Sequence, residues 1–258
     1  MKALLAASLL AVASVAAAGV AALPVPAGAA WSAAQGPRLR DATGASTNWA
    51  GYAVTGPGGS VSDVKGSWVV PAVSCAPGET SYSSHWIGID GFNSRTVEQT
   101  GTESDCRSGA PSYSAWFEFY PKFPTASRLA VHPGDVMSAE VSYSSAGRSF
   151  TLRISDLTTG LSDQASGKVN GAARSSAEWI AEAPSSSGGV LPLANFGTSQ
   201  FSASSATVSG HAGAIGSFGA AVNSIDMVSS GGGAVKASTS ALSADGTSFT
   251  VQWKARGP

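Results

Sequence analysis

Short runs of alternating apolar and polar residues, separated by turn-forming dipeptides, constrain the fold of this chain most strongly. The alternation is clearest in four runs, SYSAWFEFY, DVMSAEVSY, SFTLRIS and TSFTVQW. A period of two places successive side chains on opposite faces of a β-strand. Gly147-Arg148, Thr159-Gly160 and Asp245-Gly246 lie between such runs, and the last pair is typical of hairpins. Helical periodicity is nearly absent, so the sequence predicts an all-β fold, an antiparallel two-sheet β-sandwich.

The first 30 residues have the composition of an export signal. Lys2 is followed by an alanine-rich apolar run that ends in Ala27-Gly28-Ala29-Ala30, a small-residue pattern typical of signal-peptidase sites. A transmembrane anchor is the alternative, because the run is long, but Pro24 and Pro26 favour cleavage. We therefore expect residues 1–30 to be a signal peptide and the protein to be secreted, without a membrane contact after cleavage.

The remaining chain divides into a leader and one domain. Residues 31–45 are polar and without period, which predicts a flexible leader or a short pro-segment. Residues 46–258 carry the alternating runs. The roughly 228 residues after the signal are enough for one large domain with a substantial core. We expect a single β-sandwich domain and a monomer.

Charge excludes one class of partner. The sequence has 15 Lys and Arg, 16 Asp and Glu and a net charge of −1, with no basic segment large enough for nucleic acid. Only 12% of residues are charged, and there are 31 glycines. Turns and sheet surfaces must therefore consist largely of neutral polar groups, which suits a protein that works in acid.

The two cysteines, Cys75 and Cys106, predict a disulfide. Both belong to the exported part of the chain, and disulfides form in oxidising compartments. They flank the segment that carries Gln99, so a bond between them would hold the ends of that segment together. Two cysteines cannot form a structural zinc site, and the three histidines show no ligand spacing. We expect no metal and no organic cofactor.

Two tryptophan-containing segments carry an amide and a carboxylate that could act together. HWIGIDGFNSRTVEQTG contains Gln99, and SAEWIAEAP contains Glu178. A carboxylate can take a proton from water while an amide N–H stabilises the oxyanion that forms on an attacked carbonyl. Taken alone, Gln99 and Glu178 would each be ordinary polar residues of a strand. Their sequence contexts favour catalysis.

Those contexts resemble the eqolisins, the glutamic peptidases, whose dyad is a Gln in an LQTG-like context and a Glu in an AEW-like context. Here the contexts read EQTG and AEWI. The resemblance extends in order to NWAGY (48–52), WIGIDG (86–91) and AWFEFYP (115–121). It implies a lectin-like or glucanase-like sandwich and a secreted acid endopeptidase acting on proteins or peptides. Glu178 would be the general base and acid on water, ionised in the resting enzyme, and Gln99 would stabilise the oxyanion.

Strand alternation predicts which side chains would line a substrate groove. In Ser112–Tyr120, Trp116 and Glu118 lie on the face opposite the apolar core residues. Trp86 and Asp90 share a face of their own run, and Glu178 lies on the face opposite Trp179. We expect Trp86, Asp90, Trp116 and Glu118 to contact substrate. The alternatives are ordinary tryptophan packing and, for Asp90, an Asp-Gly turn.

Two positions depart from the eqolisin pattern. Glu103 and Ser114 stand where many eqolisins have aspartates. Both changes leave the dyad intact, but nearby carboxylates help to set the pKa of a catalytic glutamate. The pH optimum and the cleavage preference therefore do not transfer from the family.

Two other functions are compatible with a sandwich that exposes tryptophans and glutamates. A glycoside hydrolase of the glucanase type could use Glu118 and Glu178, although the close-set acids usual in glucanases are missing here. A carbohydrate-binding module of the lectin type would need only an aromatic sheet face.

Overall fold

The computed structural model describes residues 44–231 and 233–257, and in this part the chain is almost entirely β-structure. The first strands are β1 (Ala45–Ser46), β2 (Trp49–Thr55), β3 (Val61–Val69), β4 (Ser84–Ile89), β5 (Val97–Arg107), β6 (Ala110–Tyr120), β7 (Thr125–Ala126), β8 (Val136–Ser144) and β9 (Ser149–Asp156). The later strands are β10 (Leu161–Gly167), β11 (Ser176–Glu182), β12 (Ser185–Ser186), β13 (Gly189–Val190), β14 (Thr198–Val208), β15 (His211–Ala214), β16 (Val222–Val228), β17 (Val235–Thr239) and β18 (Phe249–Trp253). A short 3-10 helix, η1 (Ile215–Ala221), is the only helix in the described residues.

The predicted signal peptide and nearly all of the predicted leader lie outside the described residues. Ala45, which the sequence analysis placed in the leader, already belongs to β1 and pairs with Asp226. In the described part, no helix has the length and hydrophobicity that a membrane crossing requires.

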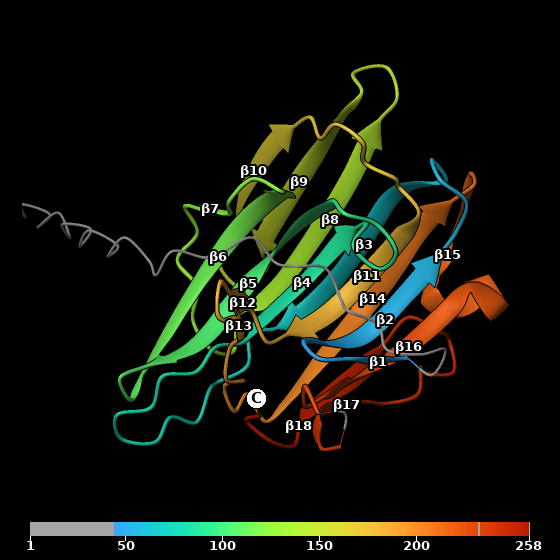
Figure 1. The fold of residues 1–258 in the computed structure, drawn as a ribbon. Coiled ribbons are helices and arrows are strands. Elements are labelled where there is room, and N and C mark those ends of the chain that lie inside the picture. The colour runs from blue at the N-terminus through green and yellow to red at the C-terminus, as the bar shows by residue number, and fades with distance from the viewer. Residues whose placement is uncertain (1–43, 232, 258) are drawn as a thin grey trace, which may run out of the picture. The chain divides into compact units, whose positions relative to one another are not determined.

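One long sheet contains most of the strands, in the order β10-β9-β8-β3-β14-β18-β17-β16-β2-β11-β4-β5-β6-β7. Its pairings are antiparallel, apart from the parallel pair of β1 and β16. The two halves of the sheet lie face to face, because β3 contacts β4 and β11, and β5 contacts β8 and β9. Figure 1 shows the strands of both halves running along the same diagonal, as in aligned sandwiches. The predicted antiparallel sandwich is confirmed.

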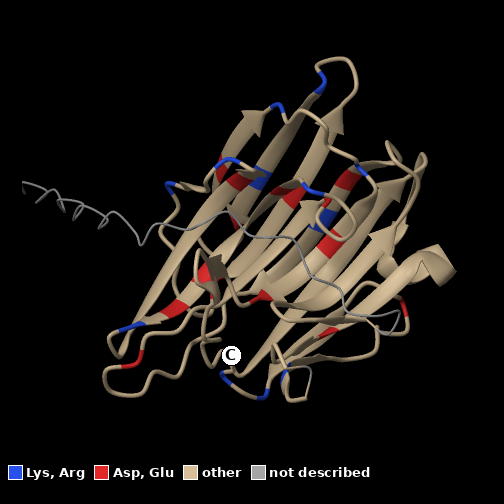
Figure 2. Ribbon diagram, viewed as in Figure 1, with Lys and Arg blue, Asp and Glu red and all other residues tan. Residues whose placement is uncertain are grey.

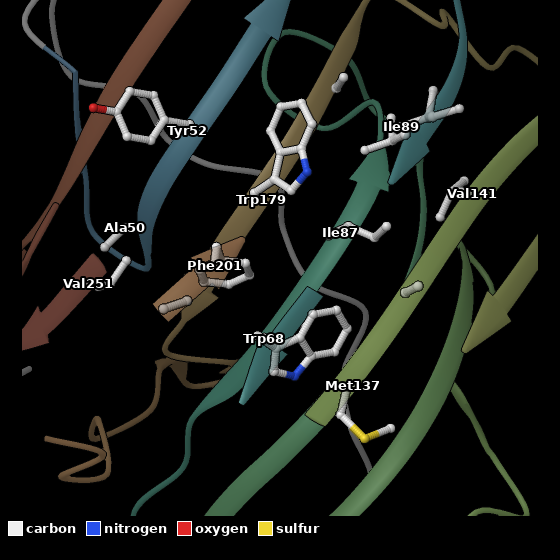
Figure 3. Packing of buried hydrophobic residues seen from close by; sticks show 14 of the residues in the cluster. Ala50, Tyr52, Trp68, Ile87, Ile89, Met137, Val141, Trp179, Phe201 and Val251 are labelled. Carbon is white, nitrogen blue, oxygen red and sulfur yellow. The ribbon is translucent and has the colours of Figure 1, made fainter. Parts of the chain in front are cut away.

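The main core lies between the two halves (Figure 3). Ile87 and Ile89 of β4 and Trp179 of β11 meet Trp68 and Met137 from the other half. Both tryptophans satisfy their indole N–H inside this core: Trp179 donates to the Lys65 carbonyl at 2.7 Å, and Trp68 donates to the Thr102 hydroxyl at 2.9 Å. The predicted inward face of β11 is therefore correct.

Turn chemistry also agrees with the sequence. Gly147-Arg148 closes the hairpin of β8 and β9, and Thr159-Gly160 closes that of β9 and β10. Asp245-Gly246 lies in the connection between β17 and β18. No sequence pattern predicts η1, because a 3-10 segment of this length needs no repeating apolar face.

The predicted disulfide is present and joins Cys75 to Cys106 at the end of β5, with 5.5 Å between the two Cα atoms. Replacing both cysteines with serine should lower the free energy of unfolding by about 3–4 kcal/mol, because the unfolded chain loses a loop constraint. Urea denaturation of the oxidised wild type and the double variant measures this difference. Equal unfolding midpoints would show that the bond contributes nothing to stability.

Candidate active site

The central feature of the site is a row of residues paired across four neighbouring strands. Glu178 of β11 pairs with Gly88 of β4, Gly88 pairs with Gln99 of β5, and Gln99 pairs with Glu118 of β6. Directly paired residues point to the same face of a sheet, and neighbouring strands lie about 4.8 Å apart. The Gln99 amide and the Glu178 carboxyl therefore share one face, two strand spacings apart.

Gly88 keeps the space between the two side chains open. A Cβ atom at this position would lie 3.0 Å from the Gln99 Cβ and 3.2 Å from the Trp86 ring. Any larger residue would project directly between the amide and the carboxyl. Because Gly88 has no side chain, nothing on β4 projects between the amide of Gln99 and the carboxyl of Glu178.

Glu178 is a buried acid without a hydrogen-bond partner. Its side chain is 0% exposed, and within the described residues neither carboxyl oxygen has a partner. Burial raises its pKa well above the usual value, and the nearby carboxylate of Asp90 adds to this effect. The Ser176 hydroxyl and the Phe92 amide favour the ionised form, but neither reaches full hydrogen-bond geometry. An unpaired buried carboxyl is costly, and a carboxyl of this kind with a strongly raised pKa is a candidate functional group.

Gln99 is oriented by Glu118. The Gln99 Nε2 donates to the Glu118 Oε2 at 2.5 Å, which leaves its second N–H for another acceptor. Burial raises the pKa of Glu118 to about 7, and the hydrogen bond from Gln99 acts in the opposite direction. The predicted substrate contact of Glu118 thus stays a prediction, while its contact with the amide is a feature of the structure.

Tryptophans surround the row on the same face. A second apolar cluster, separate from the main core, contains Trp49, Ala53, Trp86, Phe92, Trp116, Ile180 and Ile225. Trp49 and Trp86 meet edge to face with 4.8 Å between ring centroids. Trp86 and Trp116 therefore lie on the predicted face, at 0% and 8% exposure. Their contact with substrate is not tested by these positions and remains a prediction.

Asp90 has a supporting position. It adopts a positive φ of 73° directly after β4, and its carboxylate accepts the backbone N–H groups of Arg174 at 2.6 Å and Ser175 at 2.9 Å. The Asp90 side chain is fully buried and contacts other parts of the protein instead of solvent. This arrangement favours a role in which Asp90 fixes the chain entering β11, and with it Glu178, over the predicted substrate contact.

Glu182, for which the sequence predicts no role, lies on the same face of β11 as Glu178. Its carboxyl accepts the Trp86 indole N–H at 2.7 Å and the Asn48 amide at 3.1 Å. Burial raises its pKa to about 8. The spacing of Glu178 and Glu182, four residues apart on one strand, was the available signal. Glu182 holds Trp86 in place beside the row.

The two positions that depart from the eqolisin pattern form a pair. Glu103 and Ser114 lie opposite each other on β5 and β6, and the Ser114 hydroxyl donates to Glu103 at 3.0 Å. Burial, followed by the charge of Asp105, raises the pKa of Glu103 to about 8. Figure 2 shows several acidic residues within the strands, whereas most basic residues lie in loops and at strand ends. Among the described side chains, no group of three or more histidine, cysteine or acidic residues could hold a metal ion.

Comparison with known families agrees with this geometry. The model of the peptidase A4 family matches residues 47–253, which is most of the chain. The chain belongs to the peptidase A4 family. It is 32% identical to aspergillopepsin-2 of Aspergillus niger over an aligned length of 188 residues. The match covers 64% of this chain and 66% of that relative, which is just under two thirds of the relative's length.

Solved structures of the family share the fold. Aspergilloglutamic peptidase from Aspergillus niger is 30% identical, with a TM-score of 0.59 over 67% of this chain and 99% of that one. Scytalido-glutamic peptidase, solved with a peptide-based transition-state analogue, gives a TM-score of 0.67 at 23% identity over 81% of this chain and 98% of the other. These likenesses establish the architecture, which is that of the eqolisins.

Proposed function

We propose that this protein is a secreted acid endopeptidase that hydrolyses peptide bonds with Gln99 and Glu178 acting on one water molecule. The observation that carries the proposal is the unpaired, buried carboxyl of Glu178, which faces the Gln99 amide across Gly88. Membership of the peptidase A4 family supports the same reaction. The signal-like composition of residues 1–30 supports the proposed secretion.

In this mechanism Glu178 removes a proton from the water as it attacks the scissile carbonyl. The free N–H of Gln99 donates to the developing oxyanion, and Glu118 holds the amide in the required orientation. Glu178 then gives its proton to the leaving amine. The water adds directly to the carbonyl, so the reaction forms no acyl-enzyme.

The protonation of Glu178 differs from the sequence-based expectation of an ionised resting state. Burial favours its neutral form within the folded chain. A water and a peptide bound beside Glu178 would supply hydrogen-bond donors to the carboxylate, and such donors favour ionisation. The raised pKa also makes Glu178 a stronger base once ionised and a ready proton donor to the amine.

The register argues against a glucanase. Glu118 and Glu178 are separated by three strand spacings, about 14 Å between backbones, and Gln99 lies between them, bonded to Glu118. Retaining and inverting glycosidases need carboxyl separations of about 5–5.5 Å and 6.5–9.5 Å. The pair is therefore poorly placed to act on both sides of one sugar.

The test is hydrolysis of casein by the purified protein at acidic pH, beside β-glucan as the substrate of the alternative. Glu178→Gln should abolish casein cleavage while the variant stays folded, since the amide keeps the shape of the carboxyl but cannot accept the proton. Glu140→Gln, on the outer face of the other half of the sandwich, is the matched control and should retain full activity. Casein cleavage by Glu178→Gln at the wild-type rate would refute the dyad, and cleavage of β-glucan alone would refute the peptidase.

A further inference from the structure

A cationic hollow lies apart from the dyad, between the β8–β9 hairpin and the segment that joins β10 to β11. Its volume is about 470 Å³, and its lining includes Tyr143, Arg148, Lys168, Asn170 and Arg174. We call it the Arg174 pocket. Three of the lining side chains are cationic, and none is acidic.

The three cations are not neutralised by ion pairs. Within the described residues, neither Arg148, Lys168 nor Arg174 has a carboxylate within 4 Å, although four other basic side chains of this nearly neutral chain do: those of Lys65, Arg107, Arg128 and Arg256. Of the three cations, Arg174 is the one with acidic neighbours. Its backbone N–H donates to the Asp90 carboxylate, and its positive charge partly offsets the rise in the pKa of Glu98. An excess of positive charge therefore faces the hollow.

Arg174 is held rigidly in this position. Its guanidinium lies over the Tyr143 ring, 3.9 Å from the centroid, and its Nη1 donates to the Val61 carbonyl at 3.4 Å. Its backbone N–H and C=O are also fixed, by Asp90 at 2.6 Å and by the Val61 N–H at 2.9 Å. Several guanidinium N–H donors remain for a ligand, and a donor set that is already ordered loses little freedom on binding.

Two of the cations occupy an unusual backbone conformation. Arg148 and Arg174 have φ values of 49° and 48°. Residues other than glycine and asparagine rarely adopt this region, and such strain costs of order 1–3 kcal/mol. Strained residues cluster at ligand sites, where the surrounding structure enforces them. Arg148 adopts this conformation within the turn of the β8–β9 hairpin, and Arg174 adopts it where its backbone binds Asp90, so both side chains are held on backbones fixed beside the hollow.

We propose that the Arg174 pocket binds a tetrahedral oxyanion of the sulfate or phosphate type. Arginine presents N–H donors in a planar fork that matches the oxygens of such anions, and Lys168 adds a point charge. The Asn170 amide offers a further donor at the rim. Arginine and lysine stay charged in acid, so the site persists where carboxylates are neutral. The site shares no residue with the dyad and does not depend on the proposed function.

Isothermal titration of the purified protein with sodium sulfate, at ionic strength held constant with chloride, tests this proposal. One saturable site is expected, and the double variant Arg148→Ala/Lys168→Ala should bind at least tenfold more weakly. Lys122→Ala/Arg153→Ala, which removes two exposed charges elsewhere, is the matched control and should bind like the wild type. Both substituted pairs lie at exposed positions, so the variants should fold.

Absence of saturable binding to the wild type, or equal loss in both double variants, would overturn the proposal. Parallel titrations with inorganic phosphate and O-phosphoserine identify the source of the anion. Binding of inorganic phosphate without O-phosphoserine supports a free anion as the ligand. Binding of both supports a site that also accepts phosphorylated side chains.

Discussion

Replacing Gln99 with alanine should lower kcat/KM for peptide hydrolysis by two to three orders of magnitude while the fold is retained. Loss of one oxyanion donor typically raises the barrier by about 3–4 kcal/mol. Gln99 also accounts for the hydrogen bond to Glu118, so its removal leaves the buried Glu118 carboxyl without that partner. The loss should appear mainly in kcat, because the oxyanion exists only in the transition state.

Initial rates on a chromogenic peptide, together with circular dichroism to confirm folding, measure this effect. Gln164→Ala removes an exposed amide from β10 and should leave the rate unchanged. Gln99→Asn keeps the amide but shortens its reach by one methylene, so it should also lose most activity. A folded Gln99→Ala variant with wild-type turnover would show that the amide does not stabilise the transition state.

The protein should be markedly more stable near pH 5 than near pH 8. Burial raises the pKa of several carboxyls in the folded chain: Glu98 to about 9, Glu103 and Glu182 to about 8, and Glu118 to about 7. The ordinary pKa of a glutamate is 4.5. Between that value and the raised one, the folded state holds more protons than the unfolded state, so stability falls as the pH rises. Each unit of difference between the folded and the unfolded pKa changes the free energy of unfolding by about 1.4 kcal/mol. Several carboxyls with a raised pKa therefore outweigh the one or two groups whose pKa is lowered.

The opposing groups limit the effect at lower pH. Burial lowers the pKa of His85 to about 3, so this residue favours the fold at neutral pH and loses that contribution as the pH falls from about 6.5. The hydrogen bond from Arg128 lowers the pKa of Asp163 below its usual range, and its contribution is lost only in strong acid. The optimum should therefore lie in mild acid rather than at the acid extreme.

Glu98 provides the sharpest test of this pH dependence. It points into the main core, is fully buried and, among the described residues, has no hydrogen-bond partner for either oxygen. Glu98→Gln removes the titration and should raise stability at pH 8 by about 1–3 kcal/mol, with little change at pH 4. Urea denaturation at both pH values measures the difference, and Glu79→Gln serves as a control whose carboxyl has a lowered pKa. A gain of the same size at both pH values would contradict this account.

The faces of the strands could be predicted from the sequence, because a period of two fixes which side chains share a face. Glu178, Trp116 and Trp86 lie on the faces that alternation predicted. The order of the strands could not be predicted in this way. Nothing local indicates that β11 inserts between β2 and β4, and this insertion places Gly88 between Glu178 and Gln99.

The burial of these side chains and their hydrogen-bond partners also could not be predicted from local sequence patterns. Asp90 follows an Asp-Gly signature, and only the fold shows that its carboxylate holds the loop before β11. The contact of Glu103 with Ser114 likewise depends on the register of β5 and β6. In the sequence these two positions were separate departures from a family pattern. In the fold they form one cross-strand contact, in which the Ser114 hydroxyl donates a hydrogen bond to the Glu103 carboxyl.

The register of β11, β4 and β5 also determines when, during folding, Gln99 and Glu178 are brought together. Gln99 and Glu178 belong to β5 and β11, which are distant in sequence and are brought close only through β4, the strand between them. A slip of one residue in either pairing would turn one of the two groups into the hydrophobic interior. If Gln99 and Glu178 form the proposed dyad, a partly folded chain should be inactive, and peptide hydrolysis should appear only once these strands have paired in their native register.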